Sequence, residues 1–177
     1  MYPAFVLHHP SSTDREEITQ EIVKKTGATI VQSFLLSDRL AGNRASHLQA
    51  AKLAKSLAPT SHYLVFEDDC VLSEDWKMCL EGMGFTDVLY LGYNGKSSDV
   101  TFGTHALLIS PRARDKILER TESLVGAVDR KGAFDHILSK LCRQEGLLTA
   151  MPPLPEKETW AWQKKGLTSL ITGTVRS

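Results

Sequence analysis

The sequence has few cysteines, and they form no recognisable framework. Its 177 residues contain only Cys70, Cys79 and Cys142, an odd number with no Cys-x-x-Cys spacing. This pattern excludes a disulfide scaffold and the usual zinc motifs. It favours reduced, mostly buried thiols, as in a cytoplasmic protein, with Cys70 packing as a small residue rather than serving as a soft metal ligand.

An excess of one charge and a long apolar run are also missing. Lys plus Arg and Asp plus Glu number 21 each, so the formal net charge is zero. Nucleic acid is therefore not expected as a general partner, and neither is an anionic membrane surface. No apolar stretch approaches the roughly 20 residues of a membrane span. Residues 1–10 carry no basic leader of the signal-peptide kind, so we expect a cytoplasmic protein with no membrane span.

The common phosphate-binding loops are absent as well. Neither a Walker lysine loop nor a Gly-x-Gly-x-x-Gly run occurs, and nothing resembles a nucleophile elbow. If the protein binds a diphosphate, the ligand's charge must be neutralised mainly by a metal and by side chains.

What the sequence does contain is an alternation of strand and helix patterns that predicts an α/β fold. A strand over residues 2–7, a helix that Ser11 to Asp14 could cap and Gly27 ends, and a second strand over 29–34 form a β-α-β opening. Such an opening predicts a parallel pair. Further predicted elements are a loop over 37–43, a helix over about 45–58, strands at 63–66, 88–92, 104–109 and 147–150, and helices starting near 73, 111 and 134.

The acidic run Glu67-Asp68-Asp69 follows directly after the strand at 63–66, which is apolar throughout, as in a central strand buried on both faces. Three adjacent carboxylates repel one another, so a cation is expected beside them, and oxygen ligands suit Mg²⁺ or Mn²⁺. Strand alternation would point Glu67 and Asp69 toward a metal and Asp68 the other way, toward a ribose or nearby backbone. Taken alone, the run is explained more simply as an acidic turn.

Other polar residues follow predicted strands and should gather at the same edge of the sheet. His8 and Tyr93-Asn94 occupy such positions, where open α/β sheets bind ligands. Upstream of the acidic run, Arg39, Arg44 and His47 are candidates for a diphosphate, provided that the two arginines are not simply solvated. A helix N-terminus there would add amide donors.

Two further side chains have competing interpretations. Asp135 lies in the first turn of the predicted helix near 134, where an acid is favourable without any catalytic role. Beside a sugar-nucleotide site, it could instead deprotonate an acceptor hydroxyl. His105, inside a predicted strand, is expected to be a buried, hydrogen-bonded histidine rather than a ligand.

These segments, taken in order, resemble glycosyltransferase family 25, which includes the lipooligosaccharide-biosynthesis and collagen-type galactosyl- and glucosyltransferases. Asn43 stands where that family usually has cysteine. The matching segments are residues 5–7 with Thr13-Asp14-Arg15, residues 42–48 with Ser46-His47, residues 67–72, Leu91-Gly92, residues 103–110, Asp135, and Pro152-Pro153-Leu154.

The resemblance implies a GT-A-like, mixed but mostly parallel central sheet flanked by helices, with a minimal acceptor half. It implies that the acidic run acts as a DxD-like motif, with Glu67 and Asp69 binding Mn²⁺ (or Mg²⁺), and that Asp135 is the base of an inverting transfer. The contacts to the donor would come from His8, Arg44, Ser46, His47 and Asp68.

The favoured function is metal-dependent transfer of galactose or glucose from a UDP-sugar to a hydroxyl acceptor. The expected acceptor is a glycan, as in lipopolysaccharide biosynthesis. A hydroxylated nucleobase or a protein side chain stays open as acceptor. The alternatives are a non-catalytic nucleotide-sugar or glycan-binding module of reduced GT-A-like fold, and a metal-dependent phosphoesterase. We expect one domain over residues 1–177, whose tail, 156–177, closes over the donor, packs on a neighbour or is disordered.

Overall fold

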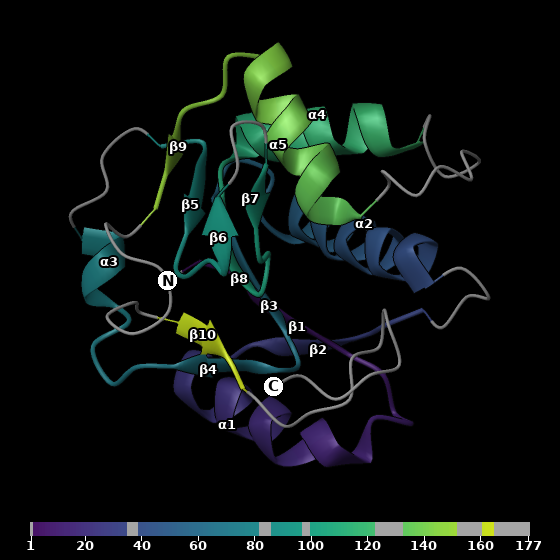
Figure 1. Ribbon diagram of the computed structural model, residues 1–177, viewed down its shortest axis with the longest axis vertical. Helices are drawn as coiled ribbons and strands as arrows, with labels where there is room; N and C mark the ends of the chain where they lie inside the picture. The colour runs from purple at the N-terminus through teal and green to yellow at the C-terminus, as the bar shows by residue number, and fades with distance from the viewer. Residues whose placement is uncertain are drawn as a thin grey trace.

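A six-stranded sheet with helices on both faces forms the centre of the chain (Figure 1). The computed structural model describes residues 2–34, 39–81, 86–96, 100–122, 133–151 and 161–164. The strand order is β2-β1-β3-β8-β5-β9. The strands are β1 (Ala4–His8), β2 (Thr29–Gln32), β3 (Tyr63–Glu67), β5 (Val88–Tyr90), β8 (Ala106–Ile109) and β9 (Thr149–Ala150).

The sheet is mixed but mostly parallel, as predicted. β1 pairs in parallel with β2 and β3, and β5 pairs in parallel with β9. β8 runs antiparallel to both of its neighbours, β3 and β5. Because β8 is reversed, its N-terminal end lies at the same edge as the carboxyl ends of β1, β3 and β5.

The helices divide the core into two layers. A 3-10 turn, η1 (Thr13–Arg15), leads into α1 (Glu16–Thr26), whose Ile18 and Ile22 pack on one face of the sheet. The other face is covered by α2 (Arg39–Leu57), α4 (Pro111–Glu122) and α5 (Phe134–Gln144). A short helix, α3 (Met78–Glu81), precedes β5. None of the helices in the ranges given above is both long and apolar enough to cross a membrane.

Three predictions about helix starts are wrong, the first for α3, which was expected to start near residue 73 and begins at Met78. α2 begins at Arg39, so Gly42 and Asn43 lie inside the helix and not in a loop. Both residues are weak helix formers, but packing of the later part of α2 against the sheet outweighs their intrinsic preference. No side chain caps α1, because the chain enters it through η1 and Arg15 occupies the N-cap position.

Two small antiparallel pairs complete the fold. β6 (Gly95–Lys96) pairs with β7 (Thr101–Phe102), and β4 (Cys70–Leu72) pairs with β10 (Ala161–Gln163). β10 lies within the predicted tail, 156–177, so part of that segment is a strand of the fold. Apart from Lys164, the other tail residues lie outside the described ranges.

The cysteines are consistent with the prediction of reduced thiols. Cys70 and Cys142 are buried and free. Cys70 packs among the apolar residues beneath α1, as expected of a small core side chain. The side chain of Cys79 lies outside the described part of the structure.

Candidate functional site

Polar residues from three strands meet at one edge of the sheet. His8 ends β1 and Glu67 ends β3, while Thr104 and His105 directly precede β8, and the Glu67 amide donates to the His105 carbonyl at 2.9 Å. The predicted gathering of residues after strands is confirmed for His8, whose Nδ1 lies 3.0 Å from Asp68 Oδ2. Asn94 also belongs to this edge, because its backbone lies against Gly103.

Glu67 faces the layer of α2 and α5. Its side chain is 17% exposed and is held by residues from α2 and from the segment before β8. The partners of Glu67 Oε1 are Thr104 Oγ1 at 3.1 Å, Asn43 Nδ2 at 3.3 Å and His47 Nε2 at 3.3 Å. These contacts fix the orientation of the carboxylate. Asn43 thus has a definite role at a position where family 25 usually has cysteine.

Asp68 and Asp69 face a different partner. Arg15 Nη1 donates to Asp68 Oδ1 and also lies 3.5 Å from Asp69 Oδ2. The prediction that Asp68 and Asp69 point to opposite sides is therefore wrong, because both carboxylates lie against Arg15. Strand alternation holds only as far as Glu67, where β3 ends and the chain turns toward β4.

Arg15 is a buried partner of the acidic run that was not predicted. Its side chain is 3% exposed, and η1 places it beneath the turn. Burial alone would lower the pKa of Arg15, but the charges of Asp68 and Asp69 outweigh that effect and raise it. The cation expected beside the acidic run is therefore supplied, at least for these two carboxylates, by the chain itself. The one sequence feature that pointed to Arg15 was the Asp14-Arg15 pair.

His8 connects the acidic turn to the protein surface. One ring nitrogen, Nδ1, lies 3.0 Å from Asp68 and 3.3 Å from Thr19 Oγ1, and the other, Nε2, lies 3.1 Å from Glu16 Oε2. The His8 side chain is 6% exposed, whereas that of Glu16 is 55% exposed. His8 is thus a buried link in a chain of polar contacts, and both of its nitrogens already have partners.

The predicted donor contacts on α2 lie deeper in the helix than expected. Because α2 begins at Arg39, Arg44, Ser46 and His47 do not head it, and the predicted free amides of a helix N-terminus are not beside them. Arg44 is buried. Ser46 Oγ donates to the Gly42 carbonyl at 2.8 Å and accepts from the amide of Phe34 at 3.1 Å. Ser46 therefore ties α2 to the segment that follows β2. The side chain of Arg39 is not among those described.

His47 is packed tightly beneath Glu67. Its ring stacks on Phe134, with centroids 3.9 Å apart and planes 7° from parallel. The side chain is 1% exposed. Within the described residues, its Nδ1 has no hydrogen-bond partner. This unpartnered nitrogen is a polar atom that a bound ligand or a water could satisfy.

Asp135 lies in the first turn of α5, as predicted. Its Oδ1 accepts a hydrogen bond from the amide of His136 at 2.8 Å. Burial raises the pKa of Asp135, and the negative charge of Glu67 acts in the same direction. A carboxylate with a raised pKa, beside a second carboxylate, is the kind of group that serves as a proton acceptor in active sites.

The oxygen ligands at this edge fit a particular kind of metal site. Among the described residues, no three His, Cys, Asp or Glu side chains are arranged to hold a metal ion. A cage built by the protein alone is therefore not formed there. Mg²⁺ and Mn²⁺ commonly bind through one or two carboxylates together with phosphate oxygens, and the carboxylates of the acidic turn are ligands of that chemical kind.

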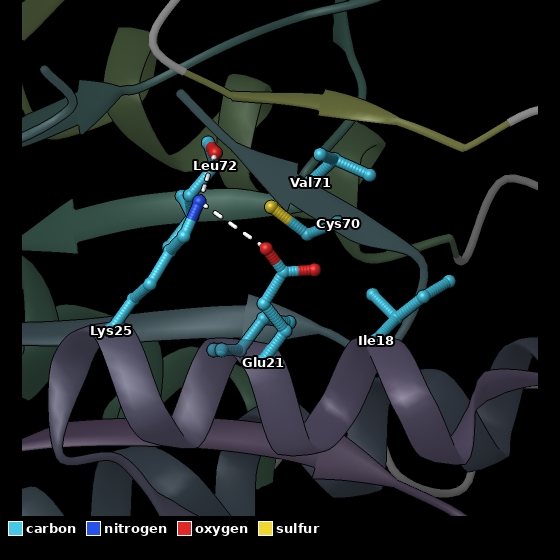
Figure 2. A pocket seen from close by; sticks show the side chains of 7 residues that line it. Ile18, Glu21, Lys25, Cys70, Val71 and Leu72 are labelled. Carbon is cyan, nitrogen blue, oxygen red and sulfur yellow. Dashed lines mark hydrogen bonds and ion pairs between the residues drawn. The ribbon is translucent and has the colours of Figure 1, made fainter. Parts of the chain in front are cut away.

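A small hollow between α1 and β4 is separate from this cluster (Figure 2). Lys25 spans it, donating to the Leu72 carbonyl at 3.1 Å and pairing with Glu21 at 3.3 Å. The volume of the hollow is about 10 Å³. Sites for small molecules usually enclose roughly 300–1,000 Å³, so this hollow is too small for a nucleotide sugar.

The strand order, the reversed β8 and the helices on both faces define a GT-A-like fold. No family model matches the sequence, and no curated protein matches it. Solved structures do match by fold. One is a glycosyltransferase involved in the glycosylation of the major capsid of PBCV-1, with 12% identity, a TM-score of 0.56, and coverage of 85% of this chain and 81% of that chain.

A second match is the glycosyltransferase GlyE of Streptococcus pneumoniae TIGR4, with 10% identity and a TM-score of 0.53. It covers 86% of this chain, which spans only 45% of GlyE. At these identities the similarity establishes the fold alone. It places the chain among proteins of GT-A-like architecture, and membership of family 25 in particular is not confirmed.

Proposed function

We propose that this chain is a metal-dependent glycosyltransferase that moves galactose or glucose from a UDP-sugar to a hydroxyl acceptor, with inversion at the anomeric carbon. One observation carries the proposal: the acidic turn lies at the carboxyl end of the central strand β3 of a GT-A-like sheet, with Asp135 close enough for Glu67 to raise its pKa. The two solved structures described above are glycosyltransferases, which supports the same class.

In this proposal, Glu67 and Asp69 hold Mn²⁺ or Mg²⁺ together with the donor diphosphate. The bound cation supplies Lewis-acid stabilisation of the negative charge that develops on the departing diphosphate. Asp135 accepts the proton of the acceptor hydroxyl, for which its raised pKa is suited. Direct attack of that hydroxyl on the anomeric carbon inverts its configuration.

The remaining predicted residues surround the donor in this proposal: His8, Arg44, Ser46, His47 and Asp68. All five are 5% exposed or less. The two oxygens of Asp68 already accept hydrogen bonds, from Arg15 and from His8. A direct contact between Asp68 and a ribose would therefore use a second lone pair of one of these oxygens. The Nδ1 of His47 has no partner among the described residues.

Isothermal titration with UDP, with and without Mn²⁺, tests the proposal. We expect Mn²⁺ to tighten UDP binding, and Asp69→Ala to weaken it by at least about tenfold, since a lost charged contact costs on the order of 1.5–3 kcal/mol. Asp75→Ala is the matched control, because Asp75 is an exposed acid in the turn after β4. UDP binding that does not depend on Mn²⁺, or that Asp69→Ala leaves undiminished, would contradict the proposed function.

A second candidate is a nucleotide-sugar-binding module without turnover. It is favoured by the burial of the acidic turn, since the side chains of Asp68 and Asp69 are 4% and 1% exposed and paired with Arg15. This candidate predicts Mn²⁺-dependent UDP binding but no release of UDP from UDP-galactose or UDP-glucose. A coupled assay for UDP, run with a panel of glycan acceptors, separates the two functions.

A further inference from the structure

Arg15 occupies a position that affects any cation at the acidic turn. Its guanidinium is buried between Asp68 and Asp69 and is 3% exposed, so solvent screens its charge very little. We propose that Arg15 is a positioning residue that competes with a divalent cation for Asp69 and thereby sets the metal affinity of that carboxylate. This inference rests on the proposed function, because it concerns the metal assigned there to Glu67 and Asp69.

The two carboxylates that share Arg15 are held unequally. The contact from Arg15 Nη1 to Asp68 Oδ1 is 2.5 Å, and His8 also lies 3.0 Å from the other oxygen of Asp68. The contact from the same nitrogen to Asp69 Oδ2 is 3.5 Å, which is longer than a normal hydrogen bond. Of these two contacts, the one with Asp69 is the longer and therefore the less costly one to exchange.

The backbone of the turn is fixed independently of these side chains. The amide of Lys164, directly after β10, donates to the Asp69 carbonyl at 2.8 Å. The adjoining pairing of β10 with β4 holds the same segment. The Asp69 carboxylate can consequently change partners while its main chain stays in place.

Opposite changes in metal affinity follow from this arrangement. Arg15→Gln removes a positive charge beside Asp69 while keeping a polar side chain, so a cation should bind more tightly. Asp68→Asn removes one of the two carboxylates that share Arg15, so the positive charge of Arg15 acts more strongly on Asp69 and a cation should bind more weakly. For charges this close and this buried, we expect changes of at least about tenfold in each direction.

The experiment is a titration of the full chain with Mn²⁺ alone, following free Mn²⁺ by electron paramagnetic resonance, with circular dichroism to verify folding. Lys25→Gln is the matched control, because Lys25 is another paired cation close to β4 but its partners are Glu21 and Glu74. We expect Lys25→Gln to bind Mn²⁺ like the unmodified chain. The double variant Arg15→Gln with Asp69→Asn should lose the gain that Arg15→Gln produces.

Changes of the same sign in Arg15→Gln and Asp68→Asn, or no change in either, would overturn the inference, as would a complete lack of Mn²⁺ binding in every variant. If Arg15→Gln does not fold, Asp68→Asn decides: weaker Mn²⁺ binding by a folded protein supports the inference, and unchanged binding refutes it. The UDP titration keeps the two proposals apart. Mn²⁺-dependent UDP binding with unaltered Mn²⁺ affinities in the variants refutes the role of Arg15 alone. Altered Mn²⁺ affinities without Mn²⁺-dependent UDP binding refute the transferase alone.

Discussion

Replacing Gly92 with alanine should push β10 away from the acidic turn. Gly92 follows β5 in a buried layer, and a Cβ added to it would lie 1.8 Å from the Ala161 carbonyl oxygen and 2.9 Å from His105 Nε2. Real Cβ atoms keep at least 3.0 Å from such neighbours, so the gap from 1.8 Å requires a retreat of about 1.2 Å. Because the nearest obstacle is backbone, a side-chain rotation cannot relieve the clash.

The size of the effect follows from what β10 contributes. Overpacking a buried site typically costs about 1–3 kcal/mol. Detaching β10 instead gives up its pairing with β4 and the bond from Lys164 to Asp69, and each backbone hydrogen bond is worth roughly 0.5–1.5 kcal/mol net. The two routes have similar costs, so the free energy of unfolding should fall by about 1–3 kcal/mol, and release of β10 should account for much of the fall.

Hydrogen exchange at single amides tests this directly. In Gly92→Ala, the Lys164 amide should exchange much faster, while amides of the central strand β3, such as that of Val65, stay protected. Gly27→Ala is the control, because Gly27 has a φ of 71° but no atom within 4 Å of an added Cβ. It should lower stability by about 1 kcal/mol through backbone strain and leave Lys164 protected. Unchanged protection of Lys164 in Gly92→Ala, together with a stability within about 0.5 kcal/mol of the original, would refute the reasoning.

Two other substitutions have defined outcomes. Burial raises the pKa of Asp135 above its ordinary 3.8, so the folded chain holds this proton more tightly than the unfolded chain, and the associated stability is lost as the pH rises through the folded-state pKa. Asp135→Asn keeps an acceptor for the His136 amide, so in urea unfolding it should be more stable than the original at pH 7 but not at pH 3.5. Its rate of sugar transfer should fall by about 10²–10⁴-fold. Lower stability of Asp135→Asn at pH 7 would contradict this. Arg114 is buried and donates to the carbonyls of Pro59 at 2.7 Å and Ala58 at 3.4 Å. Arg114→Met should lower the free energy of unfolding by about 2–4 kcal/mol because these carbonyls lose their donor, and a loss below about 1 kcal/mol would show that they find other partners.

The parts of the fold that the sequence predicts well are those encoded locally. The β-α-β opening and the buried strand before the acidic run follow from short-range apolar patterns, and the structure contains both. Likewise, Ser110-Pro111 predicts a helix start, and Ser110 Oγ accepts the amide of Ala113 at 3.1 Å, at the beginning of α4. In each case the residues that carry the signal also make the contact.

The parts that were missed depend on contacts between distant segments. Gly42 and Asn43 indicate a loop by their own preference, yet they lie in α2 because that helix packs on the sheet. β10 was not predicted, since its residues carry no strong strand pattern and are ordered by pairing with β4. Tertiary contacts outweighed local propensity at both places.

In the candidate site, too, locally encoded features were predicted and contacts between distant segments were missed. Asp135 was placed correctly because its position follows from the start of a helix. Arg15 was not recognised as the partner of Asp68, from which it is 53 residues distant, since no local spacing relates them. Asp68 and Asp69 were assigned to opposite sides because alternation was extended beyond the end of β3, whereas both contact Arg15.

The pairing of β4 with β10 also determines the order in which the acidic turn is completed during synthesis. The segments that carry His8, Arg15 and Glu67 leave the ribosome early, in the first half of the chain. The amide that holds the Asp69 carbonyl belongs to Lys164, which is added only after the strands of the central sheet. A nascent chain that has not yet reached residue 161 therefore already contains Arg15 and Asp68, the partners of the ion pair, while it still lacks the strand that pairs with β4. The charged residues of the acidic turn are synthesised first, and the residue that holds its backbone is synthesised after them.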